Sequence, residues 1–206
     1  MYLEAATLLL LASNTLASSL PVLPRQNSCP PVHVFGARET TVAPGYGTAG
    51  VVVNLVLQSN SGATAEAISY PACGGQSSCG GASYSQSAVA GTAAVASAVN
   101  SFNQRCPNTK LVLVGYSQVS QIMDLQVCVG LMYLKGGQIM DNAFCGGGDS
   151  TIGLSNTAVP ISSAALAQIK AAIFMGSPRY RAGFPYNVGT CTAQGVSQTQ
   201  PCSKLL

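Results

Sequence analysis

The sequence carries very little charge: Asp, Glu, Lys and Arg make up 7% of its 206 residues, against about a quarter in an average soluble protein. Apolar residues make up 48%, so the chain is not disordered, because disorder needs the opposite balance. The formal net charge is +3 and the nine Lys and Arg residues are scattered, which leaves no basic stripe for nucleic acid. We therefore expect one folded domain that has no nucleic-acid partner.

Long apolar runs are also missing. The stretch 5–13 is apolar but far too short for the roughly 18 residues of a membrane span. Small residues come after it around Leu16-Ala17-Ser18, a pattern typical of a secretory signal peptide, although Glu4 stands where a Lys or Arg is usual. A buried helix is the alternative interpretation. We predict a signal peptide at 1–17, a short propeptide or linker at 18–28, and a secreted, extracellular domain at 29–206.

The chain has one histidine, His33, and no Cys-x-x-Cys pair, so we expect no metal site and no cofactor. Its eight cysteines fit disulfides in an oxidising compartment. Eight cysteines allow 105 pairings, however, and the sequence alone does not choose among them. Cys73 and Cys79 are close enough for a local bridge.

The hydrophobic pattern beyond residue 32 alternates strands with helices, which predicts a mostly parallel sheet covered on both faces. Expected strands are 32–36, 67–70, 110–114 and 172–176, and expected helices are 49–57, 85–103 and 164–171. The run at 110–114 does not alternate, so this strand should be buried on both faces.

The strand at 110–114 leads directly into Gly115-Tyr116-Ser117-Gln118, which is most of a nucleophile elbow. Gly115 leaves room for the tight turn, Ser117 projects above the strand ends, and the NH of Gln118 can donate to a developing oxyanion. The fifth position of the elbow should be small, but Val119 stands there. An ordinary strand–helix turn is the alternative. The polar loop after the first strand contains Thr40, which offers a second oxyanion donor or is simply a loop threonine.

Several stretches resemble the fungal acetylxylan esterase and cutinase family, and they look closer to the acetylxylan esterase branch. They are 29–30, 32–41, 44–47, 70–75, 77–85, 114–118, 145–149 and 172–178. The resemblance implies a three-layer α/β-hydrolase fold with a mostly parallel five-stranded sheet. It implies a secreted, monomeric serine esterase acting on acetylated xylan, with Ser117 as nucleophile and Thr40 and Gln118 as the oxyanion hole. A cutinase or short-chain lipase is the alternative within this class.

The resemblance also implies three disulfides, Cys29–Cys106, Cys73–Cys79 and Cys145–Cys202. Two cysteines, Cys128 and Cys191, are then left unpaired or paired with each other.

An insertion comes directly after the elbow. Without residues 119–135 the chain reads Gly115-Tyr116-Ser117-Gln118-Gly136, a complete Gly-x-Ser-x-Gly motif. The insert repeats part of the next segment at an offset of seventeen: Gln121-Ile122-Met123-Asp124 recurs at Gln138-Ile139-Met140-Asp141, and Cys128 and Gly130 match Cys145 and Gly147. A tandem duplication is one explanation. A translated intron of 51 nucleotides (seventeen codons) is another, because valine codons begin with GT and a lysine codon can end in AG.

The second departure from the family pattern is at the carboxyl end, where the segment expected to carry the triad aspartate and histidine is absent. We expect a C-terminally truncated domain in which no residue supplies the triad His and Asp. His33 begins a buried strand and is expected to be structural, and Asp124, Asp141 and Asp149 are interpreted as ordinary helix or loop carboxylates. Serine without a base is a poor nucleophile, so activity of this chain is doubtful. A non-catalytic truncated product or pseudoenzyme is the alternative function.

Overall fold

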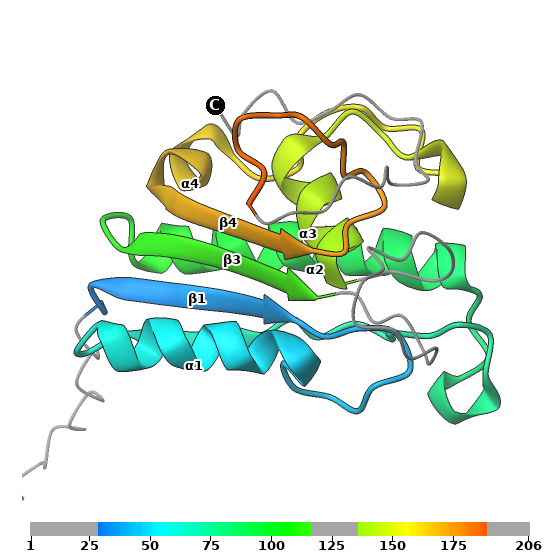
Figure 1. The fold of residues 1–206 in the computed structure, drawn as a ribbon, viewed down its shortest axis with the longest axis horizontal. Helices are drawn as coiled ribbons and strands as arrows, with labels where there is room; N and C mark the ends of the chain where they lie inside the picture. Colours follow the sequence, from blue (N-terminus) through cyan, green and yellow to red (C-terminus); the bar gives the residue numbers. More distant parts are fainter. Residues whose placement is uncertain (1–28, 117–135, 189–206) are drawn as a thin grey trace, which may run out of the picture.

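The computed structural model describes residues 29–116 and 136–188. In these two ranges four strands form one parallel sheet in the order β2-β1-β3-β4. They are β1 (Val32–Ala37), β2 (Thr64–Ala67), β3 (Lys110–Tyr116) and β4 (Ile169–Met175). The helices are α1 (Gly50–Ser59), α2 (Tyr84–Arg105), α3 (Gly136–Cys145) and α4 (Ser163–Gln168), with short 3-10 turns at Gly47–Ala49, Ser77–Cys79 and Ser150–Ile152. Figure 1 shows the arrows of β1, β3 and β4 pointing the same way.

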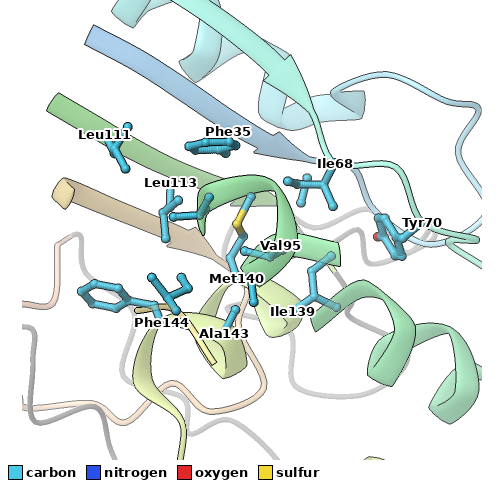
Figure 2. Packing of buried hydrophobic residues seen from close by; sticks show 14 of the residues in the cluster. Phe35, Ile68, Tyr70, Val95, Leu111, Leu113, Ile139, Met140, Ala143 and Phe144 are labelled. Carbon is cyan, nitrogen blue, oxygen red and sulfur yellow. The ribbon is translucent and has the colours of Figure 1, made fainter. Parts of the chain in front are cut away.

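The sheet separates two apolar clusters, because successive side chains of a strand point to opposite faces. On β3, Leu111 and Leu113 enter the cluster shared with α2 and α3, while Val112 and Val114 enter the cluster shared with α1. Figure 2 shows the larger cluster, which contains Phe35, Val95, Ile139, Met140 and Phe144 among others. The predicted α/β fold with helices on both faces of a parallel sheet is therefore confirmed, as is burial of both faces of this strand.

Three details of the prediction were wrong. The resemblance implied five strands, whereas the described part of the chain forms four. The second strand is Thr64–Ala67 rather than 67–70, because this edge strand pairs with β1 through a segment that carries polar side chains. The last helix also ends earlier than expected: α4 stops at Gln168 and β4 begins at Ile169.

α2 begins at a capping box, in which the Ser83 hydroxyl accepts a hydrogen bond from the Gln86 NH and the Gln86 side chain accepts one from the Ser83 NH. Both donors would otherwise lack partners at the helix start. No described helix is long and apolar enough to cross a bilayer.

Candidate active site

The carboxyl ends of three strands meet at one edge of the sheet, where ligands bind in parallel α/β folds. Ala37 at the end of β1 is in register with Gly115 of β3, and Tyr116 at the end of β3 is in register with Met175 at the end of β4. The loop carrying Thr40 leaves β1 here, and α3 begins here.

The start of α3 lies directly against the ends of β1 and β3. A Cβ atom on Gly136 would overlap the carbonyl oxygens of Tyr116, Ala37 and Arg38, and one on Gly115 would overlap the Gly136 carbonyl group. This contact therefore requires glycine on both sides.

Ser117 and Gln118, the predicted nucleophile and oxyanion donor, lie outside the described residues. So do 1–28 with the predicted signal peptide, the insertion at 119–135, and Cys128, Cys191 and Cys202. Their predicted roles stay predictions. The structure defines what surrounds the elbow: the Gly115–Tyr116 end of β3, the start of α3, and the Thr40 loop.

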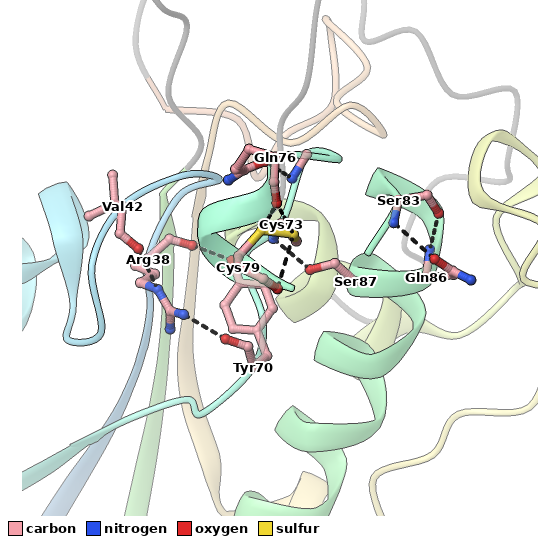
Figure 3. Close-up of a disulfide and its surroundings, with 10 residues drawn as sticks. Arg38, Val42, Tyr70, Cys73, Gln76, Cys79, Ser83, Gln86 and Ser87 are labelled. Atoms are coloured by element: carbon pink, nitrogen blue, oxygen red, sulfur yellow. Dashed lines mark hydrogen bonds between the residues drawn. A yellow bond between two sulfur atoms is a disulfide. The ribbon is translucent and has the colours of Figure 1, made fainter. Parts of the chain in front are cut away.

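The Thr40 loop is anchored by the buried side chain of Arg38. Its guanidinium donates hydrogen bonds to the carbonyl oxygens of Val42 (2.9 Å), Ile68 (3.4 Å) and Tyr70 (2.5 Å). The Tyr70 hydroxyl donates a hydrogen bond to the Arg38 carbonyl oxygen at 2.6 Å. Figure 3 shows both residues beside the Cys73–Cys79 disulfide. Burial raises the pKa of Tyr70, so its hydroxyl keeps the proton that this hydrogen bond requires.

Glu39 holds the other side of the loop. Its carboxylate accepts hydrogen bonds from the NH of Thr48 at 3.0 Å and from the Thr48 hydroxyl at 2.7 Å. Neither Arg38 nor Glu39 is free to contact a substrate, because both side chains are buried in loop contacts. Their function here is to fix the path of the chain through Thr40.

Thr40 itself is 8% exposed, and its Oγ1 has no hydrogen-bond partner among the residues that the structure describes. Such buried, unsatisfied groups are uncommon and call for an explanation. The next residue, Thr41, has φ of +68°, a left-handed conformation that costs a non-glycine residue roughly 1–3 kcal/mol and often marks functional sites. Its NH donates to the Ala72 carbonyl at 2.8 Å, which ties the loop to the segment before Cys73.

The disulfide between Cys73 and Cys79 closes the loop that faces Thr40. The backbone NH of Cys73 donates to the Ser87 hydroxyl of α2 at 2.9 Å (Figure 3). A Cβ on the neighbouring Gly74 would lie 3.3 Å from Cγ2 of Thr40, so the two loops are in contact. The threonine is thus held between β1 and a loop cross-linked to itself and hydrogen-bonded to α2.

A second disulfide joins Cys29 to Cys106, which brings the chain before β1 to the end of α2. Two of the three bridges implied by the resemblance are therefore present. Cys145 is also disulfide-bonded, while its predicted pairing with Cys202 involves a residue outside the described ranges.

Asp149 is the centre of a buried polar network beneath the first turn of α3. Its carboxylate accepts hydrogen bonds from Gln138 (2.6 Å) and Asn142 (3.3 Å) of α3, and from the NH and hydroxyl of Thr151. Gln138 in turn accepts a hydrogen bond from the Tyr84 hydroxyl of α2 at 2.5 Å. The network fixes the position of α3 behind the site.

Asp141 forms a second buried contact, with the loop after β4. Its carboxylate accepts a hydrogen bond from the Ser177 hydroxyl at 2.7 Å and lies 3.4 Å from the guanidinium of Arg179, which also donates to Asn142 at 3.1 Å. Burial raises the pKa of Asp141, and attraction to Arg179 lowers it by less. Asp141 thus lies in α3 and Asp149 in the loop after it, as the sequence predicted, and both are buried and hold α3 in place.

His33 lies near the amino end of β1, at the edge of the sheet opposite Thr40. Its ring stacks on Phe102 at 3.9 Å between centroids, and its Nδ1 lies 2.6 Å from the Thr64 hydroxyl. It is 4% exposed. The prediction of a structural histidine is confirmed. Within the described residues, no three His, Cys, Asp or Glu side chains are grouped as a metal ion would need.

Comparison with known proteins agrees with this architecture. Residues 28–204 match the family named Cutinase. The chain is 66% identical over 189 residues to Cutinase 11 of Verticillium dahliae, covering 92% of this chain and 58% of that protein. It is 58% identical over 184 residues to Acetylxylan esterase 2 of Talaromyces purpureogenus, covering 88% of this chain and 71% of that protein.

A solved acetyl xylan esterase, an iodinated complex, superposes with a TM-score of 0.75 at 58% identity, covering 86% of this chain and 79% of that one. Since the chain spans 58% of the length of Cutinase 11, these likenesses concern the part that is shared. The parallel sheet, the helices on both of its faces and the long matched region show together that the chain belongs to the cutinase family.

Proposed function

We propose that this protein is a secreted carboxylic-ester hydrolase that removes acetyl groups from xylan through an acyl-enzyme on Ser117. The observation that carries the proposal is the carboxyl edge of the sheet. There, the end of β3 meets the glycine start of α3 beside a buried Thr40 whose hydroxyl has no partner among the described residues.

In the proposed reaction the Ser117 hydroxyl attacks the acetyl carbonyl and gives its proton to a water molecule, which returns a proton to the leaving sugar oxygen. The tetrahedral oxyanion accepts hydrogen bonds from Thr40 and from the backbone NH of Gln118. Collapse of the intermediate releases the sugar hydroxyl and leaves an acetylated serine, which water then hydrolyses. A donor held ready in a fixed loop suits this role, because it needs no reorganisation as charge develops.

Turnover by this chain should be slow. His33 is the only histidine in the sequence, and it lies at the opposite edge of the sheet, stacked on Phe102. Removal of triad members leaves residual catalysis from the oxyanion hole and from substrate binding alone. We therefore infer impaired activity.

Acetylated xylan is the proposed substrate because Acetylxylan esterase 2 and a solved acetyl xylan esterase are both similar to this chain. A cutinase or short-chain lipase is the second candidate, favoured by the 66% identity to Cutinase 11. Extracellular location is supported by the disulfides, which persist in oxidising compartments. The proposed domain begins at residue 29, after a signal peptide and a short propeptide or linker.

Hydrolysis of 4-nitrophenyl acetate by the purified chain and by its Ser117→Ala variant tests the proposal. We expect a slow release of nitrophenol that falls to the background rate in the variant. Equal rates above background in both proteins would remove Ser117 from the mechanism. No activity in either would support the alternative of a non-catalytic protein on this scaffold.

The two candidate substrates are separated by acyl-chain length. An acetylxylan esterase is expected to prefer the acetyl ester, whereas a cutinase or lipase would hydrolyse the butyryl ester or esters of longer acyl chains at least as fast. The ratio of the two rates is independent of the fraction of active protein.

A further inference from the structure

The repeat after β3 gives the chain two possible continuations of that strand: residues 119–135, the first copy, and residues 136–152, the second copy. In the structure, α3 (Gly136–Cys145) is built from the second copy. We propose that this second copy is the authentic continuation of β3, and that residues 119–135 are a surplus copy whose removal leaves the fold intact. The inference rests on described contacts and holds whether or not the protein is an esterase.

Tyr116 and Gly136, the described residues on either side of the surplus segment, lie at the distance of a tight turn. A Cβ on Gly136 would lie under 3.0 Å from the Tyr116 carbonyl oxygen. A Cα–Cβ bond is about 1.5 Å and a carbonyl oxygen is about 2.4 Å from its own Cα, so the Cα atoms of Tyr116 and Gly136 are less than about 7 Å apart. That is the limit for the first and fourth residues of a turn. Ser117 and Gln118 alone can therefore join β3 to α3.

The first turn of α3 accepts the second copy and not the first. At the offset of seventeen, Val119 corresponds to Gly136 and Ser120 to Gly137. A Cβ on Gly136 would overlap three backbone carbonyl oxygens, and one on Gly137 would lie 3.0 Å from the Met175 carbonyl oxygen. Backbone atoms of two strand ends and a loop cannot move away as a side chain can, so a valine is excluded there.

The loop after α3 also fits the residues of the second copy and not those of the first. Gly146 and Gly148 have φ of +67° and +70°, a region that residues with β-branched or bulky side chains rarely adopt. A Cβ on Gly146 would also lie 2.9 Å from the Thr157 carbonyl oxygen, and one on Gly148 would lie 2.8 Å from that of Leu154. The first copy has Val129 and Leu131 at these two positions.

The polar network beneath α3 also depends on residues found in the second copy. Asn142 donates to Asp149 and accepts from Arg179, while Asp149 also binds Gln138 and Thr151. The residues of the first copy that correspond to Asn142 and Asp149 are Leu125 and Met132, which can form none of these hydrogen bonds. The residues that both copies share, such as Gln121 and Gln138, do not distinguish them.

Two deletions of equal length test the proposal by thermal unfolding. Removing residues 119–135 keeps the second copy, and removing residues 136–152 keeps the first. We expect a cooperative unfolding transition for the first deletion and none for the second. A first deletion without a cooperative transition would overturn the proposal, as would a second deletion that unfolds at the same temperature as the first.

A point substitution in the variant that lacks residues 119–135 tests whether the close contact at Gly136 is required for stability. Gly136→Val places the residue of the first copy against the strand ends, and we expect the unfolding temperature to fall by at least ~5 °C. Asn60→Ala, at the carboxyl end of α1, is the matched control and should change it by less than half as much. An unchanged unfolding temperature in Gly136→Val would contradict the proposed register.

Discussion

Replacing Arg179 with methionine is expected to lower the free energy of unfolding by about 3–5 kcal/mol at neutral pH, which is the usual cost of removing one partner of a buried ion pair. The guanidinium of Arg179 lies 3.4 Å from the Asp141 carboxylate, and both side chains are largely buried. Methionine keeps much of the volume but leaves the carboxylate with the Ser177 hydroxyl. Urea unfolding at pH 7 measures the loss.

The loss should shrink at acid pH. Burial already raises the pKa of Asp141 in the folded state, and Arg179 opposes this, so the substitution raises that pKa further. A folded-state pKa above the unfolded value means that stability rises as the pH falls through the folded pKa. The variant should therefore approach the parent below that pKa. A loss that is the same at pH 7 and pH 4 would contradict this account.

A matched double variant separates charge from packing. Adding Asp141→Asn to Arg179→Met removes the uncompensated carboxylate, while the amide oxygen can still accept the hydrogen bond from Ser177. We expect the double variant to be more stable than Arg179→Met at pH 7. If it is less stable, then the carboxylate is not the source of the loss.

Replacing both Cys29 and Cys106 with serine is expected to lower the free energy of unfolding by about 4–5 kcal/mol, according to the loop-entropy relation. This disulfide joins residues 77 apart in sequence, and so it constrains the unfolded chain strongly. A change of this size is comparable with the whole stability of many domains, about 5–15 kcal/mol.

The Cys73–Cys79 bridge provides the matched control. It closes a loop of six residues, for which the same relation gives about 2 kcal/mol. Denaturant unfolding of the two double-serine variants should therefore show the larger loss for Cys29 and Cys106. Equal losses, or a larger one for the short loop, would contradict the entropic explanation.

The sequence predicted the centre of the sheet well, because its signals there are unambiguous. β1 is apolar except for His33, β3 has an uninterrupted apolar run from Leu111 to Val114, and both strands are buried between two helical layers. β2 was misplaced because an edge strand needs little apolar surface: Glu66 belongs to it, whereas the more apolar Ile68 and Tyr70 are buried after it ends. Periodicity reports burial, and burial is not restricted to strands.

The candidate site was predicted in outline but not in its supports. Gly115 and the Thr40 loop were predicted because a strand there ends in a recognisable turn. Asp141 and Arg179 carried no such signal, because the two residues are 38 positions apart in sequence. The repeat also prevented the sequence from choosing between its copies. The close contacts of Gly136 with three backbone carbonyl oxygens favour the second copy.

Ser117 is the proposed nucleophile at the carboxyl edge of the sheet, and locating the acetyl group after prolonged exposure to 4-nitrophenyl acetate tests this assignment. A single acylation suffices, and deacylation should be slow because His33 lies at the opposite edge. We expect mass spectrometry of the digested protein to place the acetyl group on Ser117, with no such label in the Ser117→Ala variant. Acetylation confined to other side chains, at the same level in both proteins, would contradict the account.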